Sequence, residues 1–374
     1  MKFLILSTAT GQGHNSASLA VRECLEARGC RAEVLDVLKL RNSKTSRHVS
    51  SLYADVTVHV PYLFGLLYRA GMSLSRPGGC SPIFFLNTFY AKQLCSKICT
   101  YRPDVIVCPH IFSAQAVTWL RRKSGLTVPA VGLVTDYTCI PFWEESALDS
   151  YIIPSASLAA EFIQRGIPAD RLVPIGIPVR SQFLRHTQKS EARQRLGLSL
   201  SGYIFLVMGG SMGYGNLAAL AEGLLSAVPG SRVVALCGNN IPLFRKLSSM
   251  SHCITPLCYT EKVGLYMDAA DVVLTKPGGL SSTEAIAKHI PTVLTHPIPG
   301  CEQQNAAFLA RHGAAIFADS ISRAVLEACH LALDKEAARK MAEAQEQFYP
   351  ADTDSRIADY LISLAPPPCN SISL

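Results

Sequence analysis

The stretch of residues 271–305 constrains the fold of this chain more than any other. It begins with a short apolar run at residues 272–274, typical of a buried strand, which a turn at residues 277–279 ends. The hydroxyl-rich residues 281–284 then predict the start of a helix, with serines as caps, and residues 291–294 predict a second strand. A strand, a helix and a strand in this order predict a βαβ unit with parallel strands.

Two features of this unit predict a site for a nucleotide sugar. The start of a helix offers free backbone N–H groups, which suit a diphosphate. The turn after the second strand presents Glu302, Gln303 and Asn305, whose carboxylate and amides suit the hydroxyls of a sugar. An ordinary βαβ unit with a capped helix is the alternative. Ligands of open parallel sheets lie beyond the carboxyl ends of strands, so polar groups at two successive strand ends favour a binding site.

Two further glycine loops each stand between a predicted strand and a predicted helix. The first, residues 7–16, contains Gly11 and Gly13 and precedes a helical pattern at residues 17–28. The second occupies residues 208–216. The first loop holds only half of the G-x-G-x-x-G fingerprint, which argues against a dinucleotide cofactor.

Length and element order predict the domain organisation. A chain of 374 residues is long enough for two domains with separate cores, and 49% apolar with 17% charged residues exclude disorder. A hinge at residues 176–179 would join an N-terminal domain, residues 1–178, to a C-terminal domain, residues 179–345, and we expect residues 365–374 to be frayed. Strands alternate with helices throughout, which predicts an α/β fold with parallel sheets. The predicted strands are residues 2–6, 32–37, 104–108, 130–134, 151–153, 172–175, 203–208, 232–236, 252–256, 271–274, 292–294 and 315–317.

The absence of several signals predicts the compartment. The chain starts with a strand and shows no signal-peptide pattern, and glycines interrupt its longest uncharged stretch, residues 196–221. The 13 cysteines show no metal-binding spacing and lie mostly on apolar elements. We therefore expect a cytoplasmic protein with reduced thiols and no metal site.

The net charge of +7 gathers partly in a segment that is also aromatic, residues 39–76. No nucleic-acid-binding motif accompanies this segment, so the pattern argues against a nucleic-acid partner. It suits an anionic membrane surface, on the inner face of the cell membrane. A solvated basic face over ordinary core aromatics is the alternative.

Four motifs give the chain a family resemblance, which covers roughly residues 1–345. It resembles the monogalactosyldiacylglycerol synthase and processive diacylglycerol glucosyltransferase family, and more distantly the transferase that adds N-acetylglucosamine to the lipid-linked peptidoglycan precursor. The motifs are Gly-Gln-Gly-His-Asn-Ser-Ala at residues 11–17, Thr-Asp-Tyr at 135–137 with Trp143 after it, Gly-Ile-Pro-Val at 176–179, and Thr-Lys-Pro-Gly-Gly at 275–279 continuing to Asn305.

The resemblance implies a GT-B fold, with two Rossmann-like domains facing a central cleft and a C-terminal helix, residues 346–364, packing back on the first domain. It implies an inverting transfer of a hexose from a UDP-sugar to diacylglycerol or a glycosylated form of it, without metal or other cofactor. His14 would be the general base and Asp136 would orient it or share its role, on an acceptor loop with Gly11, Gly13 and Asn15. Donor binding would fall to Gly210, Ser211, Lys276, Gly278, Gly279, Ser281, Ser282, Thr283, Glu284, Glu302 and Gln303, with Glu284 on the ribose and Glu302 and Gln303 on the hexose.

One departure concerns the acceptor site. Family members often carry a histidine between the Thr-Asp pair and the tryptophan, where this chain has Ile140. Two other enzymes stay open as alternatives. The first is a peptidoglycan-type transferase that uses UDP-N-acetylglucosamine, and the second is a nucleotide-sugar 2-epimerase, for which the apolar stretch of residues 58–68 would have no purpose.

Overall fold

The N-terminal half of the chain folds round a parallel sheet of six strands. The computed structural model describes residues 1–8, 12–40 and 61–366. In this sheet the strand order is β2-β1-β3-β4-β5-β6. The three strands β3, β4 and β5 are buried along their whole length, as expected of continuous apolar runs in a sheet covered on both faces. The strands are β1 (Lys2–Ser7), β2 (Arg31–Asp36), β3 (Val105–Cys108), β4 (Ala130–Leu133), β5 (Ser150–Ile153) and β6 (Leu172–Pro174).

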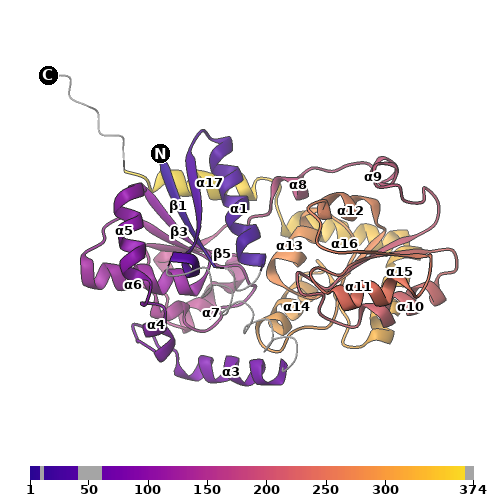
Figure 1. The fold of residues 1–374 in the computed structure, drawn as a ribbon, viewed down its shortest axis with the longest axis horizontal. Helices are drawn as coiled ribbons and strands as arrows, with labels where there is room; N and C mark the ends of the chain where they lie inside the picture. The colour runs from indigo at the N-terminus through magenta and orange to yellow at the C-terminus, as the bar shows by residue number, and fades with distance from the viewer. Residues whose placement is uncertain (9–11, 41–60, 367–374) are drawn as a thin grey trace.

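The C-terminal half repeats this architecture with a second parallel sheet of six strands in the order β12-β11-β10-β7-β8-β9. Figure 1 shows the two domains beside each other, each with helices packed round its own sheet. The strands are β7 (Ile204–Met208), β8 (Arg232–Leu236), β9 (Ile254–Leu257), β10 (Val272–Thr275), β11 (Thr292–Leu294) and β12 (Ile316–Phe317).

The helices connect successive strands and cover the sheets. The N-terminal domain contains α1 (Gln12–Ala27), α3 (Pro61–Leu74), α4 (Pro82–Leu86), α5 (Ala91–Tyr101), α6 (Ile111–Ser124) and α7 (Ala159–Gln164), with short 3-10 turns at Val37–Leu40, Trp143–Glu145, Ala156–Leu158 and Ala169–Arg171. The rest of the chain contains α8 (Ser181–Leu184), α9 (Lys189–Leu196), α10 (Leu217–Ala227), α11 (Ile241–Ser248), α12 (Val263–Ala269), α13 (Gly279–Ala287), α14 (Cys301–Arg311), α15 (Ile321–Leu333), α16 (Lys335–Phe348) and α17 (Thr353–Ser363).

All twelve strands predicted from the sequence are present, with ends that differ by no more than two residues. Two predicted helix starts are wrong. Helix α1 begins at Gln12 instead of Ala17, so the polar residues expected on a loop form its first turns. Helix α13 begins at Gly279 with Gly278 as its N-cap, so Ser281 and the residues after it lie inside the helix and do not cap it. Polar composition resembles a loop, but it equally suits helix residues that face a cleft.

The hinge after β6 is held by carboxylates from two helices. Glu23 of α1 accepts hydrogen bonds from Arg180 Nε (3.1 Å) and from the backbone N–H of Ser181 (2.8 Å). Asp354, at the start of α17, accepts a hydrogen bond of 3.2 Å from the backbone N–H of Val179. Helix α17 lies against α1, over the N-terminal domain (Figure 1). Eight of the ten residues of the predicted tail, residues 367–374, lie outside the described residues.

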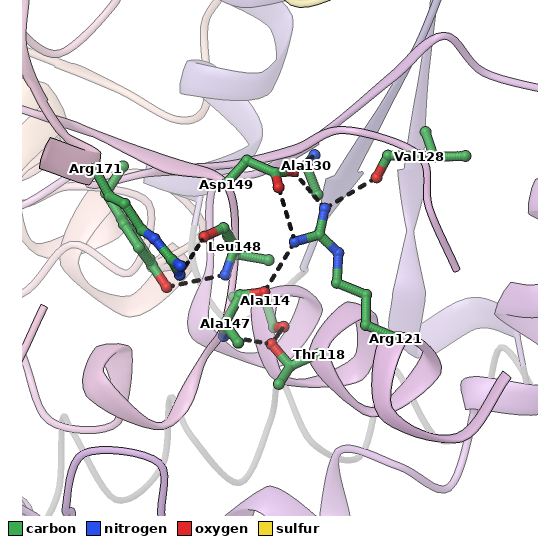
Figure 2. Close-up of polar contacts among 10 residues, drawn as sticks. Ala114, Thr118, Arg121, Val128, Ala130, Ala147, Leu148, Asp149 and Arg171 are labelled. Carbon is green, nitrogen blue, oxygen red and sulfur yellow. Dashed lines mark hydrogen bonds and ion pairs between the residues drawn. The ribbon is translucent and has the colours of Figure 1, made fainter. Parts of the chain in front are cut away.

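A second network ties the N-terminal ends of β4 and β5 to α6, on the edge of the sheet away from the cleft. Figure 2 shows the Arg121 guanidinium beside the Asp149 carboxylate, donating hydrogen bonds of 3.0 Å each to the backbone carbonyls of Val128 and Ala147. Asp149 in turn accepts a hydrogen bond of 2.7 Å from the backbone N–H of Ala130. One ion pair therefore binds three backbone groups beside the starts of these two strands.

Candidate active site

Residues that follow the carboxyl ends of strands in both sheets lie opposite each other across one cavity. In each sheet the order in which successive strands are added reverses between two neighbouring parallel strands, β1 and β3 in one domain and β7 and β10 in the other. Ligands of such folds bind at this switch point, beyond the carboxyl ends of the strands. The segments after β1 and β7 and the start of α13 meet there, and they line a cavity between the domains that is open to solvent.

This cavity brings together part of the predicted site. Gly13, Asn15 and Ser16 line it from the N-terminal domain. From the C-terminal domain, the predicted residues that line it are Gly210, Ser211, Ser281 and Glu284. Gly11 lies outside the described residues.

Glu284 lies on the inner wall of the cavity and is bonded across the interdomain gap. Its Oε1 accepts a hydrogen bond of 2.9 Å from the hydroxyl of Ser16 in α1. Burial raises the pKa of Glu284 from its usual value near 4.5 to about 7, although the Ser16 hydroxyl and the charge of Arg180 oppose the shift. The second oxygen of Glu284 forms no hydrogen bond with any residue that the structure describes, and a buried carboxylate of this kind is suited to accept hydrogen bonds from the vicinal hydroxyls of a ribose.

His14 lies in the first turn of α1, and its contacts define its tautomer. Its Nδ1 is 3.1 Å from the carbonyl oxygen of Pro109 and 3.1 Å from Thr135 Oγ1. Because the carbonyl can only accept, Nδ1 carries the proton and Nε2 keeps its lone pair. Burial lowers the pKa of His14, while the charge of Asp136 and the Pro109 carbonyl act in the other direction. His110 packs edge-on against this ring, with the ring centroids 4.5 Å apart. The lowered pKa favours the neutral imidazole, whose Nε2 can accept a proton, and His14 is not among the residues that line the cavity.

Asp136 makes its hydrogen bond to the opposite domain. Its Oδ1 accepts from Asn305 Nδ2 at 2.9 Å, and Asn305 Oδ1 accepts from the backbone N–H of Tyr137 at 2.7 Å. The hydrogen bonds of His14 go to Pro109 and Thr135, so Asp136 acts on His14 through its charge. We expected Asn305 to face a sugar, but it is fully buried and forms these two hydrogen bonds between the domains.

Several predicted donor residues hold the domains together and do not line the cavity. The start of α13 presses on the end of β4, where a Cβ on Gly279 would lie 1.8 Å from the carbonyl oxygen of Thr135. Only glycine fits at this contact. Thr283 Oγ1 lies 2.7 Å from the hydroxyl of Tyr137, and both side chains are buried. Ser282 is also fully buried, and its hydroxyl has no partner in the part of the chain that the structure describes.

Lys276 and Glu302 form a buried ion pair behind the second glycine loop. The second oxygen of Glu302 accepts a hydrogen bond of 2.9 Å from the backbone N–H of Ile298, which fixes the carboxylate. A Cβ on Gly210 would lie 3.0 Å from Lys276 Cε, so the loop after β7 packs against the lysine stem. A Cβ on Gly278 would lie within 3.7 Å of both side chains of the pair. Gln303 is exposed at the start of α14.

Four segments of the cavity wall were missed in the sequence. These are the residues after the hinge, the end of β8, a segment that follows β9, and the start of α12. Their lining residues are Arg180, Gln182, Phe183, Leu236, Gly238, Cys258, Tyr259, Thr260, Glu261 and Val263. The segment after β9 follows the carboxyl end of a parallel strand, a position that could have identified it. Ile140 is half-buried and packs on the N-terminal core.

Two structural features are absent from residues 1–8, 12–40 and 61–366. Within these ranges, no group of three or more histidine, cysteine, aspartate or glutamate side chains has the arrangement of a metal site. None of the helices described there is both long and apolar enough to cross a membrane. The twelve cysteines in the described ranges are free thiols.

Solved structures with the same fold come from several enzymes. The chain aligns with MurG of Acinetobacter baumannii at 15% identity and a TM-score of 0.62, covering 97% of this chain and 99% of that one. It aligns with the calicheamicin glycosyltransferase CalG4 at 15% identity and a TM-score of 0.63, covering 97% of each chain. It aligns with the UDP-GlcNAc 2-epimerase of Neisseria meningitidis at 15% identity and a TM-score of 0.61, covering 97% of this chain and 100% of the epimerase. The fold is therefore the GT-B fold of glycosyltransferases, which the epimerase shares.

Sequence families separate the two enzyme classes. Residues 14–179 match the model of monogalactosyldiacylglycerol (MGDG) synthase, and residues 204–356 match the C-terminal domain of glycosyltransferase family 28. The chain belongs to this monogalactosyldiacylglycerol synthase family of glycosyltransferases. It is 26% identical to a processive diacylglycerol beta-glucosyltransferase of Bacillus cereus, over 97% of this chain and 93% of that protein. An enzyme of the same name from Bacillus cytotoxicus is also 26% identical, over 96% of this chain and 93% of that protein.

Proposed function

We propose that this glycosyltransferase moves a hexose from a UDP-sugar to diacylglycerol or to a glycosylated diacylglycerol. The observation that carries the proposal is the pairing of two groups across one cleft. Glu284 of the C-terminal domain lies in the cavity wall, and its carboxylate is suited to accept hydrogen bonds from ribose hydroxyls. His14 of the N-terminal domain lies on α1, the helix that forms the facing wall, and its neutral imidazole is suited to act as a base. The similarity to diacylglycerol glucosyltransferases over nearly the whole chain supports the choice of acceptor.

In this reaction the acceptor hydroxyl oxygen attacks the anomeric carbon of the hexose, and the bond from that carbon to the UDP oxygen breaks. The acceptor proton passes to His14 Nε2, and UDP leaves with the bonding electron pair. The attack from the opposite side inverts the anomeric centre. A base of this kind typically contributes about 10²–10⁴-fold to the rate.

We propose that the donor is held without a metal ion. The free N–H groups at the start of α13 and the glycine loop after β7 would face the diphosphate, where a helix N-terminus favours negative charge. Lys276 would add positive charge to the leaving UDP while it holds Glu302, whose carboxylate would meet the hydroxyls of the hexose.

The membrane surface is the proposed partner of the N-terminal domain, on the inner face of the cell membrane. The described part of the basic and aromatic segment includes α3, on which Leu66, Arg69 and Leu74 are exposed. Phe85 and Leu86 of α4 add apolar surface nearby, and α3 and α4 lie at the same lower edge of the domain (Figure 1). Residues 41–60 of the segment lie outside the described residues.

The test is a transfer assay with three donors. Purified protein is incubated with radiolabelled UDP-glucose, UDP-galactose or UDP-N-acetylglucosamine over liposomes that contain either diacylglycerol or a lipid-linked peptidoglycan precursor, and the lipids are separated. Labelled glycosyl-diacylglycerol from a hexose donor supports the proposal and identifies the sugar. Transfer of N-acetylglucosamine to a lipid-linked peptidoglycan precursor alone would favour the peptidoglycan-type alternative. Conversion of UDP-N-acetylglucosamine without lipid product would favour the epimerase.

A further inference from the structure

Helix α3 spans both domains at the mouth of the cleft. Its C-terminal half packs on the N-terminal domain, where a Cβ on Gly71 would lie 3.2–3.3 Å from the side chains of Pro141 and Phe142. Its N-terminal half reaches the C-terminal domain, where a Cβ on Gly65 would lie 2.9 Å from Pro299 Cβ. Figure 1 shows α3 running along the lower edge of the molecule, towards α14. The helix therefore has one face against the active-site loops of both domains.

Tyr68 lies between these two glycines on the same face of α3. Its ring packs directly on Gly300, where an added Cβ would lie 3.0–3.4 Å from three carbons of the tyrosine. Gly300 has a φ of 114°, which side-chain-bearing residues rarely adopt, so its position before α14 is also restricted. The tyrosine ring is thus held in place by backbone that precedes Glu302.

The hydroxyl of Tyr68 is buried and has no hydrogen-bond partner in the ranges that the structure describes. Buried tyrosine hydroxyls usually have a partner, because leaving one unpaired costs about 1–3 kcal/mol. Burial raises the pKa of Tyr68, and the neighbouring Cys301 and Asp136 raise it further. These neighbours place the phenol on the side of the cleft where Asp136 lies, away from the nucleotide cavity, whose lining does not include Tyr68.

We propose that Tyr68 binds the acceptor, with its hydroxyl hydrogen-bonded to an oxygen of the glyceride head that enters between α3 and Asp136. This inference rests on the proposed function. The outer face of α3 carries the exposed Leu66 and Leu74, so one helix turns apolar side chains to the lipid and a polar group to the reacting end of the same lipid. The acceptor oxygen satisfies a hydroxyl that has no protein partner in the described structure.

The test compares Tyr68→Phe with the wild type in the transfer assay. Phenylalanine keeps the ring on Gly300 and removes only the hydroxyl. We expect kcat/KM for diacylglycerol, measured at saturating donor, to fall about three- to tenfold, the effect of one lost hydrogen bond. The KM for the UDP-sugar and the affinity for UDP should not change. The melting temperature of the free protein should stay the same or rise, because an unpaired buried hydroxyl is removed.

Tyr360→Phe on α17, at the opposite edge of the molecule from α3, is the matched control and should behave as the wild type (Figure 1). A Tyr68→Phe variant with an acceptor kcat/KM within about twofold of the wild type, below the effect of one hydrogen bond, overturns the assignment. An equal loss of kcat/KM for the donor and for the acceptor, or a lowered melting temperature, would show that Tyr68 is a structural residue. Either result also overturns the assignment. If the wild type transfers no hexose to diacylglycerol, the proposed function itself fails first.

Discussion

The hydroxyl of Ser16 in the N-terminal domain donates a hydrogen bond of 2.9 Å to Oε1 of Glu284 in the C-terminal domain. This contact links the helix that carries His14 to the helix that carries the proposed ribose ligand. It satisfies one carboxylate oxygen, and no described residue forms a hydrogen bond with the other. A residue of the N-terminal domain therefore acts directly on the ionisation of a residue in the C-terminal domain.

Replacing Ser16 should move the pH at which UDP binding improves. The ribose hydroxyls donate to the ionised carboxylate, so UDP affinity of the wild type should rise with pH through about 7, the pKa of Glu284. Ser16 lowers that pKa, and Ser16→Ala should shift the midpoint upward by about one pH unit, since a hydrogen bond to a charged group is lost. Calorimetric titration with UDP from pH 5.5 to 8.5 measures this. Ser363→Ala, an exposed serine on α17, is the control, and an unshifted midpoint would contradict the assignment.

Glu284→Gln should separate stability from binding. The folded-state pKa of about 7 lies above the unfolded value near 4.5, so the folded protein holds a proton that the unfolded chain has lost. Stability is lost as pH rises between these values, and the full cost is present above pH 7. The glutamine variant removes up to about 3 kcal/mol of this cost. Its melting temperature should exceed that of the wild type at pH 8 and approach it near pH 5.

The same variant should bind UDP at least tenfold more weakly at pH 8, because the ribose loses a charge-assisted acceptor worth about 1.5–3 kcal/mol. Phosphate titration of UDP is common to both proteins and cancels in the comparison. Unchanged UDP affinity in the folded variant would show that Glu284 does not bind the nucleotide.

Membrane docking should depend on the exposed apolar side chains of the N-terminal domain. Sedimentation with vesicles should increase with the fraction of anionic lipid and decrease with salt, because salt screens surface charge. Phe85→Ser with Leu86→Ser should reduce binding at every lipid composition, since inserted apolar surface is lost. The matched control is Leu326→Ser with Leu333→Ser, two leucines exposed on α15 of the other domain. Equal binding to neutral and anionic vesicles would exclude an electrostatic contribution to membrane docking.

Sequence periodicity and turn residues were sufficient to predict both sheets. Buried parallel strands are continuous apolar runs bounded by glycine and proline, so all twelve could be located. The starts of α1 and α13 could not be predicted in this way. A polar run such as residues 12–16 is equally compatible with a loop and with a helix that faces a cleft. Only the folded chain shows that the carbonyl of Thr135 occupies the space beside Gly279 and thereby fixes where α13 begins.

The resemblance named candidate site residues, but it could not show which of them line the cavity. Asn305 and Thr283 belong to the same motif block as Glu284, yet they bond to Asp136 and Tyr137 of the other domain. Pairing between domains is a property of the tertiary structure, and no local pattern encodes it. The Ser16 contact was missed for the same reason, since its partner is 268 residues away in sequence.

Activity should survive chelation of metal ions. The free N–H groups at the start of α13 and the positive charge of Lys276 are proposed to stabilise the leaving diphosphate, a task that magnesium performs in other transferases. The transfer rate in excess EDTA should therefore equal the rate without it. Complete loss of transfer that magnesium or manganese restores would contradict the proposed arrangement.

His14 and Asp136 should show linked effects on turnover and on its pH dependence. His14→Ala should lower kcat by about 10²–10⁴-fold, the usual effect of losing a general base. UDP affinity should remain nearly intact, because the proposed nucleotide ligands lie on the other domain. Burial lowers the pKa of His14, so the acid limb of the wild-type pH–rate profile should lie below pH 6.5, where the imidazole becomes protonated.

The carboxylate of Asp136 stabilises the protonated imidazole, so its charge raises the pKa of His14. Asp136→Asn should move the acid limb to still lower pH and also reduce kcat, because the imidazolium that forms during transfer loses its counter-charge. If both residues serve one proton transfer, the double variant should be no slower than His14→Ala alone. A His14→Ala enzyme that keeps more than about a tenth of wild-type turnover, well short of a general base's effect, would transfer the role of base to Asp136.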